Sequence, residues 1–145
     1  MISYHQLDSD LLATHRESYK KTLNALRPSG DISKEWLLKS FENMQKQWSK
    51  VFVALHTKDG LIGSQTLLIE QKMLRNGAKA WHLEDACVQV SYQWQGIWKK
   101  LLELVIKEAE NVWCYKIIAD TREELVPWFE KYWFDSPERM IRKYL

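Results

Sequence analysis

The stretch Tyr92–Trp98, YQWQGIW, decides how this chain is interpreted. It follows EDACVQV (84–90), which has the composition of a strand, and it leads into IWKKLLELVIKEAE (97–110), whose apolar residues recur at helical spacing. The free N–H groups at a helix N-terminus favour an anion, and a glycine lets the backbone approach it. The loop therefore predicts a site for a phosphate-bearing ligand, although a single glycine also fits an ordinary connection.

The flanking sequence alternates between helical and strand-like runs. We expect a strand at 2–7, a helix from Leu11 to Leu26 that ends before Pro28, and a helix over 33–47. Two hairpins follow, with turns at Lys58–Gly60 and Arg75–Lys79. After the central loop and helix we expect a buried strand at 115–120, a helix over 122–132 and a last strand ending in RKYL (142–145).

Length, charge and cysteine content limit the classes of protein to which this chain can belong. The 145 residues fit one domain, 1–145. A net charge of +2 without a basic stripe argues against nucleic-acid binding, and no apolar run reaches the length of a membrane span. Two cysteines without a CxxC pair, and no signal-peptide pattern, favour a cytoplasmic protein. The four histidines are scattered, so no metal site is expected.

The loop Gln93-x-x-Gly96-x-Trp98 resembles the Q/R-x-x-G-x-G/A signature with which GNAT acetyltransferases hold the pyrophosphate of acetyl-CoA. Three further stretches, 66–88 (TLLIEQKMLRNGAKAWHLEDACV), 114–120 (CYKIIAD) and 126–134 (VPWFEKYWF), resemble the glucosamine-6-phosphate N-acetyltransferase family in the same order and spacing. The likeness covers roughly residues 20–145.

The resemblance implies a fold and a reaction. The fold is α/β (α+β), a mixed and mostly antiparallel sheet with a splayed parallel strand pair and about four helices. The reaction is direct attack of the amine of glucosamine 6-phosphate on acetyl-CoA, in the UDP-N-acetylglucosamine pathway, by a homodimer without a metal. Such attack needs a neutral amine, an oxyanion donor and a proton source for the leaving thiolate.

The resemblance also assigns residues to the site. Glu84, Asp85 and Asp120 match the acids that hold the sugar and orient its amine, and Phe129 stands at the place of the catalytic tyrosine. The cofactor-binding positions are Ala86, Cys87, Val88, Gln93, Trp94, Gln95, Gly96, Ile97, Trp98, Lys99, Leu125 and Phe129. The substrate-binding positions are Arg27, Lys72, Met73, Leu74, Arg75, Glu84, Asp85, Tyr115, Lys116 and Arg142, several of them contributed by a partner subunit in the family. From its apolar surroundings in the sequence, Cys87 is read as a buried structural thiol.

Several positions depart from the family pattern. Five tryptophans stand where relatives carry glycine, namely Trp81, Trp94, Trp98, Trp113 and Trp133. Leu125 replaces an asparagine that helps to hold the cofactor, and Phe129 lacks the tyrosine hydroxyl that protonates the thiolate. Two hypotheses follow: an N-acetyltransferase whose rate is lowered, or a non-catalytic member of the fold, natural or engineered, whose cofactor groove is filled with indole.

Overall fold

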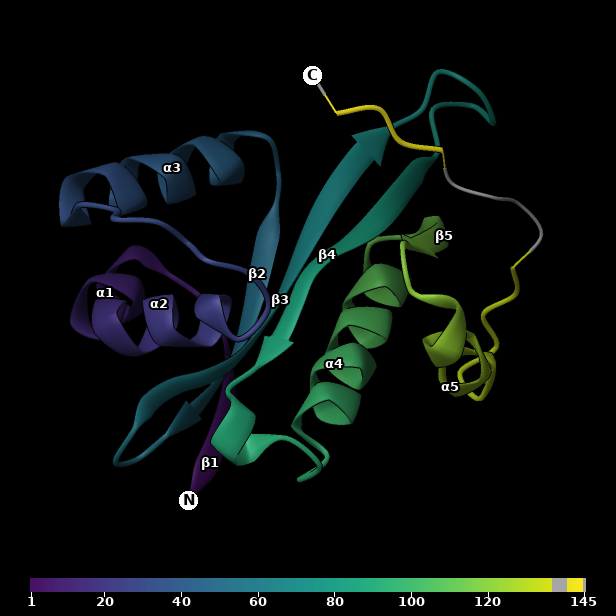
Figure 1. Cartoon of the computed structure of the whole chain (residues 1–145). Helices are drawn as coiled ribbons and strands as arrows, with labels where there is room; N and C mark the ends of the chain where they lie inside the picture. The colour runs from purple at the N-terminus through teal and green to yellow at the C-terminus, as the bar shows by residue number, and fades with distance from the viewer. Residues whose placement is uncertain (137–140, 145) are drawn as a thin grey trace.

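A mixed five-stranded sheet forms the centre of the described part of the chain, which in this computed structural model comprises residues 1–136 and 141–144 (Figure 1). Its strands lie in chain order: β1 (Ile2–Gln6), β2 (Lys50–His56), β3 (Gly60–Gln71), β4 (Lys79–Val88) and β5 (Cys114–Ala119). All neighbours are antiparallel except β4 and β5, which are parallel. The expected mixed sheet with one parallel pair is therefore confirmed.

Helices cover both faces of this sheet (Figure 1). On one face lie α1 (Ser9–Thr14), α2 (Arg16–Asn24) and α3 (Lys34–Lys46), and on the other lie α4 (Ile97–Asn111) and α5 (Val126–Glu130). Because both faces are covered, β2 and β3 are long buried runs, without the alternation of a half-exposed strand.

Local chemistry fixes where two of the helices begin. The Ser33 hydroxyl accepts a hydrogen bond from the backbone N–H of Trp36 at 3.1 Å, and the Asp8 carboxylate accepts one from Leu11 at 2.7 Å. Each side chain satisfies one of the N–H groups that a helix start leaves without a partner. The predicted helix over 33–47 is thereby confirmed with its caps in place.

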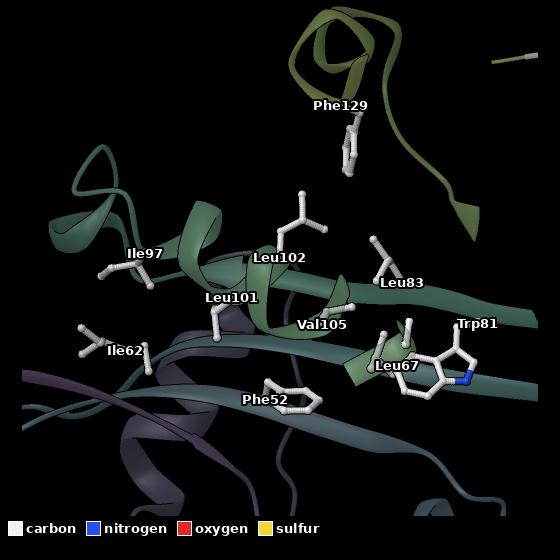
Figure 2. Close-up of a cluster of buried hydrophobic side chains, with 12 residues drawn as sticks. Phe52, Ile62, Leu67, Trp81, Leu83, Ile97, Leu101, Leu102, Val105 and Phe129 are labelled. Atoms are coloured by element: carbon white, nitrogen blue, oxygen red, sulfur yellow. The ribbon is translucent and has the colours of Figure 1, made fainter. Parts of the chain in front are cut away.

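A single apolar layer joins α4 to the sheet. Ile97, Leu101 and Val105 on α4 are buried against Phe52, Ile62, Leu67 and Leu83 of the strands, and Figure 2 shows Phe129 pointing from α5 toward Leu102. A fully buried Leu or Phe contributes roughly 1.5–3 kcal/mol. This layer sets the position of the α4 N-terminus relative to the end of β4.

Three details differ from the sequence-based expectation. The first predicted helix is interrupted at His15, whose φ of −110° separates α1 from α2. The helix expected over 122–132 is a 3₁₀ turn at Glu123–Leu125 followed by the short α5, because Pro127 fits only the first turn of a helix. Residues 141–144 form no strand, and Leu145 lies outside the described residues.

Within the described part of the chain, no helix is long and apolar enough to cross a membrane.

Candidate active site

Strands β4 and β5 are paired along the first half of β4 and separate in its second half. Their parallel register runs from Lys79 opposite Cys114 to Leu83 opposite Ala119, where β5 ends, while β4 continues to Val88. Among the described residues, Glu84–Val88 therefore have no strand partner on the β5 side. Backbone groups along such an edge pair readily with an extended ligand.

A bulge interrupts β4 at the start of this open edge. Thr66 of β3 pairs with Glu84 and Ser64 pairs with Cys87, so that Asp85 and Ala86 together face Gln65 alone. Asp85 takes a φ of 49°, a left-handed conformation that Asp tolerates better than most residues. The bulge breaks strict alternation, and by this register Glu84 and Cys87 share the sheet face of α1–α3. Alternation through 84–87 could not have predicted that arrangement.

Gln65 supports the bulge from β3. Its side chain is almost fully buried, and its amide nitrogen donates a hydrogen bond to the Glu84 carbonyl oxygen at 3.1 Å. A buried amide that binds a main-chain carbonyl restricts how the bulge can move. This role could not be predicted from the sequence, because an isolated glutamine in a strand has no characteristic pattern.

Three carboxylates gather where the strands part. Glu84 is half-buried, and burial, followed by the charges of Asp85 and Asp120, raises the pKa of its carboxyl group. Asp120 follows the end of β5 directly, and its carboxylate accepts a hydrogen bond from Arg142 at 2.7 Å. The structure thus brings Asp120 to Glu84 and Asp85, from which it is distant in sequence. A carboxylate with a raised pKa beside two other acids is suited to bind an amine and take its proton.

His82 adds a basic group to the same face, and sequence reasoning missed its part in the site. Its Nε2 lies 2.9 Å from a Glu70 carboxylate oxygen, and Glu70 also forms an ion pair with Lys72. The charge of His82 lowers the pKa of Glu84 and partly offsets the effect of the acids. The spacing His82-x-Glu84 was the available signal, because residues two apart in a strand share a face.

Arg142 lies beside the acids and comes from the C-terminal part of the chain. It donates a hydrogen bond to the Tyr144 hydroxyl at 3.1 Å in addition to its bond to Asp120. The hydrogen bond and charge of Arg142, followed by the charge of Arg27, lower the pKa of the Tyr144 hydroxyl. Arg27 follows α2 and is exposed. Arg142 thus forms the cationic side of the site, next to Asp120.

The other predicted substrate residues lie at the far end of the β4–β5 pair. The Arg75 guanidinium lies 5.0 Å from the Tyr115 ring centre and the Lys116 ammonium lies 5.6 Å from it. Met73 and Leu74 are exposed at the tip of the β3–β4 hairpin. Four residues of strand separate Lys116 from Asp120, about 13 Å at roughly 3.3 Å per residue. These side chains are too distant to share one sugar with the acids of the same chain.

The central loop ends on a left-handed glycine. Gly96 has a φ of 74° and caps α4 without a side-chain hydrogen bond, and a Cβ built on it would meet nothing within 4 Å. Gln93 donates to the Val88 carbonyl and Gln95 to the Ser91 carbonyl, both at 3.3 Å. Lys99 is exposed in the first turn. The open space at Gly96, the uncapped helix start and a nearby lysine fit a pyrophosphate group.

Aromatic rings bridge the gap between α4 and α5. Trp98 stacks on Trp128 with ring centres 4.2 Å apart and planes within 7°, and it meets the edge of Phe129 at 5.5 Å. Trp98 therefore faces α5, whereas Trp94 is fully exposed. Leu125, in the 3₁₀ turn before α5, is partly exposed. These rings pack between the first turn of α4 and α5, and Phe129 offers no hydroxyl there for a departing thiolate, so in this respect the residues fit the family's reaction poorly.

Cys87 is buried, and burial together with the charge of Asp85 raises the pKa of its thiol to about 12. A thiol with that pKa is protonated at neutral pH and is a poor nucleophile. Among the described residues, no group of three or more His, Cys, Asp or Glu is arranged to hold a metal ion.

Known proteins resemble this chain in sequence and in structure. Residues 12–133 match the acetyltransferase (GNAT) family. A glucosamine 6-phosphate N-acetyltransferase of Trypanosoma brucei brucei is 36% identical over 95 residues, which span 65% of this chain and 63% of that protein. Glucosamine 6-phosphate N-acetyltransferase 1 of Dictyostelium discoideum is 29% identical over 147 residues, spanning 99% and 91% of the two chains.

A solved acetyltransferase from Trypanosoma brucei superposes with a TM-score of 0.92 at 27% identity, covering 100% of both chains. The sheet with its parting strands, the loop before α4 and the sequence match all agree. This chain belongs to the GNAT family of acetyltransferases.

Proposed function

We propose that this chain is a glucosamine 6-phosphate N-acetyltransferase that moves the acetyl group of acetyl-CoA onto the sugar amine. The observation that carries the proposal is the meeting of Glu84, Asp85 and Asp120 with Arg142 where β4 and β5 part. Acids beside a guanidinium group complement a molecule with an amine at one end and a phosphate at the other. The names of the relatives support the same substrate.

The acids prepare the nucleophile. An amino sugar arrives largely as an ammonium ion, and the carboxylates of Glu84, Asp85 and Asp120 attract that charge. Glu84, with its raised pKa, is the best placed of the three to accept the proton as the amine attacks. His82, held by Glu70, lies on the same strand face as Glu84 and adds a positive charge there.

The open edge of β4 binds the thioester end of acetyl-CoA. Backbone N–H groups of Ala86–Val88 supply donors for the pantetheine arm and for the oxyanion of the tetrahedral intermediate. The loop Gln93–Lys99 holds the pyrophosphate. Acetyl-CoA supplies the activated acyl group, and the amine attacks it directly because the Cys87 thiol stays protonated.

The leaving thiolate has no hydroxyl donor at position 129, because Phe129 is a buried hydrocarbon. A free thiol has a pKa of about 8.5, so its thiolate is a fair leaving group even without a proton donor. The missing hydroxyl therefore slows the reaction without abolishing it. The alternative of a non-catalytic protein is not favoured, since the named relatives are enzymes.

A homodimer completes the phosphate side of the site. Arg75, Lys116 and the exposed Met73 and Leu74 lie too far from the acids of their own chain, and a partner chain brings such residues to the neighbouring site. Apolar side chains at an exposed hairpin tip are typical of an interface. Light scattering is expected to give twice the chain mass of 17.3 kDa. A monomer at working concentration would contradict this part of the proposal.

The activity is tested by measuring release of the CoA thiol with glucosamine 6-phosphate and, as the control, with glucosamine at the same concentration. We expect acetylation of the phosphorylated sugar to be faster, with the preference shrinking as salt is added. Equal rates with both sugars at low salt would remove the phosphate requirement. We place the reaction in the cytoplasm, as part of UDP-N-acetylglucosamine synthesis.

A further inference from the structure

Tryptophan occupies backbone conformations in this chain that favour glycine. Four tryptophans have a positive φ: Trp48 (60°), Trp94 (68°), Trp113 (57°) and Trp133 (65°). Bulky residues are outliers in the left-handed region, whereas Asn and Asp visit it more readily. The other described non-glycine residues with a positive φ are Arg75 and Asn76 in a tight turn and Asp85 in the β4 bulge.

Three of the four positions are helix ends of one type. After α3, Trp48 N–H bonds to the Gln45 carbonyl at 2.9 Å and Ser49 N–H bonds to the Met44 carbonyl at 3.0 Å. This pair of bonds defines the Schellman ending, in which the left-handed residue is usually glycine. Trp48 stands at that glycine position.

The end of α5 repeats both bonds, and the end of α4 has the first of them. After α5, Trp133 N–H bonds to the Glu130 carbonyl at 3.0 Å and Phe134 N–H bonds to the Phe129 carbonyl at 3.4 Å. After α4, Trp113 N–H bonds to the Glu110 carbonyl at 3.2 Å. The fourth position, Trp94, lies two residues before Gly96, in the loop that precedes α4.

The indole rings make few packing contacts that could offset the strain of the left-handed backbone. Trp94, Trp113 and Trp133 are at least nine-tenths exposed, and Trp48 is more than half exposed. In contrast, Trp81 is fully buried and Trp128 stacks in the α4–α5 cluster. A strained conformation persists where surrounding contacts repay it. At positions 94, 113 and 133 the backbone favours glycine while the side chain contributes almost nothing to packing; at position 48 the indole lies 5.8 Å from the Lys79 ammonium and is still more than half exposed.

We propose that positions 48, 94, 113 and 133 are glycine in the protein that the source cell makes, because its ribosomes read as glycine one of the codons written here as tryptophan. Trp48 was not among the positions that the sequence resemblance marked, so the backbone identifies it independently. Random substitution would seldom place tryptophan in the left-handed region. Four of the eight tryptophans lie there, each more than half exposed. The proposal concerns the identity of residues and is separate from the reaction proposed above.

The direct test is mass spectrometry of peptides from the protein purified from its own cells. We expect peptides spanning positions 94, 113 and 133 to have the lower mass of glycine at each of these sites. Peptides that carry tryptophan at these positions would overturn the proposal. The measurement needs no activity, so its outcome is independent of whether glucosamine 6-phosphate is the substrate.

A second test uses the chain expressed with tryptophan. Trp48→Gly, Trp113→Gly and Trp133→Gly should each raise the midpoint of urea unfolding, and each should do so by more than the matched alanine variant. Alanine also removes the indole but keeps the Cβ, so a larger gain with glycine reports the left-handed backbone. Trp36→Gly, in the interior of α3, is the control and should lower the midpoint. Glycine variants that are no more stable than the alanine variants would contradict the conformational basis of the proposal.

Discussion

The two halves of the site at the parting of β4 and β5 differ in how completely they are built. The acceptor half combines the acids Glu84, Asp85 and Asp120 with Arg142, and its groups already contact or influence one another. The cofactor half has a suitable loop and open strand edge, but the Trp98 ring packs against Phe129, and Phe129 has no hydroxyl. On the function proposed above, we expect this contrast to leave sugar binding intact and to slow acyl transfer.

Removal of the central acid should have the largest effect. If Glu84 takes the proton from the amine, Glu84→Gln should lower kcat/KM by roughly 100- to 10,000-fold. The wild-type rate should fall on acidification at a pH above the ordinary range of Glu, because burial and Asp85 raise the pKa of Glu84. Steady-state kinetics over pH check both statements. Glu110→Gln, an exposed acid at the far end of α4, is the matched control and should leave the rate unchanged.

The same Glu84→Gln substitution, which should lower the rate, should raise the stability of the folded state. The folded state holds the Glu84 proton more tightly than the unfolded state, so this group costs stability as pH rises through its raised folded pKa. At neutral pH Glu84→Gln should therefore unfold at higher urea concentration than wild type. A variant that loses both rate and stability would indicate a structural role for Glu84.

Restoring the missing hydroxyl should have the next largest effect. Added to the Trp98→Gly variant, Phe129→Tyr should raise kcat by about 100-fold, the lower range for a positioned proton donor. Its effect on acetyl-CoA affinity should be small, because only one oxygen is added. Comparing kcat and the dissociation constant of the double and single variants separates the two effects. An unchanged kcat would mean that the thiolate leaves without help from position 129.

Opening the ring stack should change affinity. Trp98→Gly should tighten acetyl-CoA binding by roughly 30-fold, about 2 kcal/mol, the central cost of placing excess volume in a packed site. Titration calorimetry measures the change, and Trp94→Gly is the control because that indole is fully exposed. Micromolar binding by the unmodified chain would show that the stack leaves the groove open.

The two halves also differ in how much of each could be predicted from the sequence. The succession of elements as far as β5, the extent of α3 and the loop with Gly96 followed from local patterns, because turns and periodicity act over a few residues. The site assignments came from resemblance, and the structure places Glu84, Asp120 and Arg142 together. The contacts of Gln65 and His82 depend on the β4 bulge and on pairing across the sheet, which no local pattern encodes.

Tertiary packing explains the main structural errors. A helix from Leu11 to Leu26 fits the apolar spacing, yet the chain breaks at His15 so that α1 and α2 can each pack on the sheet. The strand expected at the C-terminus is absent from 141–144, where Arg142 instead bonds to Asp120. Side-chain pairing of this kind cannot be predicted from β propensity alone.

Weakening the cationic side should have a smaller effect on the acceptor half. Arg142→Gln should reduce the preference for glucosamine 6-phosphate over glucosamine by about tenfold, near 1.5 kcal/mol for a charged hydrogen bond. Binding of both sugars at low salt gives the ratio. Lys107→Gln, on the outer side of α4, keeps the change in net charge but lies away from the site, so its ratio should not change. Equal losses for both sugars would point to disruption of Asp120 instead of phosphate binding.

The smallest effect on rate is expected at Cys87, which lies between the two halves. Burial raises the pKa of its thiol to about 12, so at neutral pH it is protonated and unsuited to carry the acetyl group. Cys87→Ala should leave kcat within about twofold, while the lost burial costs roughly 1 kcal/mol of stability. An acyl-enzyme route would give ping-pong kinetics and an inactive Cys87→Ala variant. Direct attack instead requires both substrates to be bound at the same time. Initial rates measured while both substrate concentrations are varied distinguish the two routes. Intersecting double-reciprocal lines, together with an active alanine variant, would show that the acceptor half and the cofactor half bind their substrates at the same time in one ternary complex.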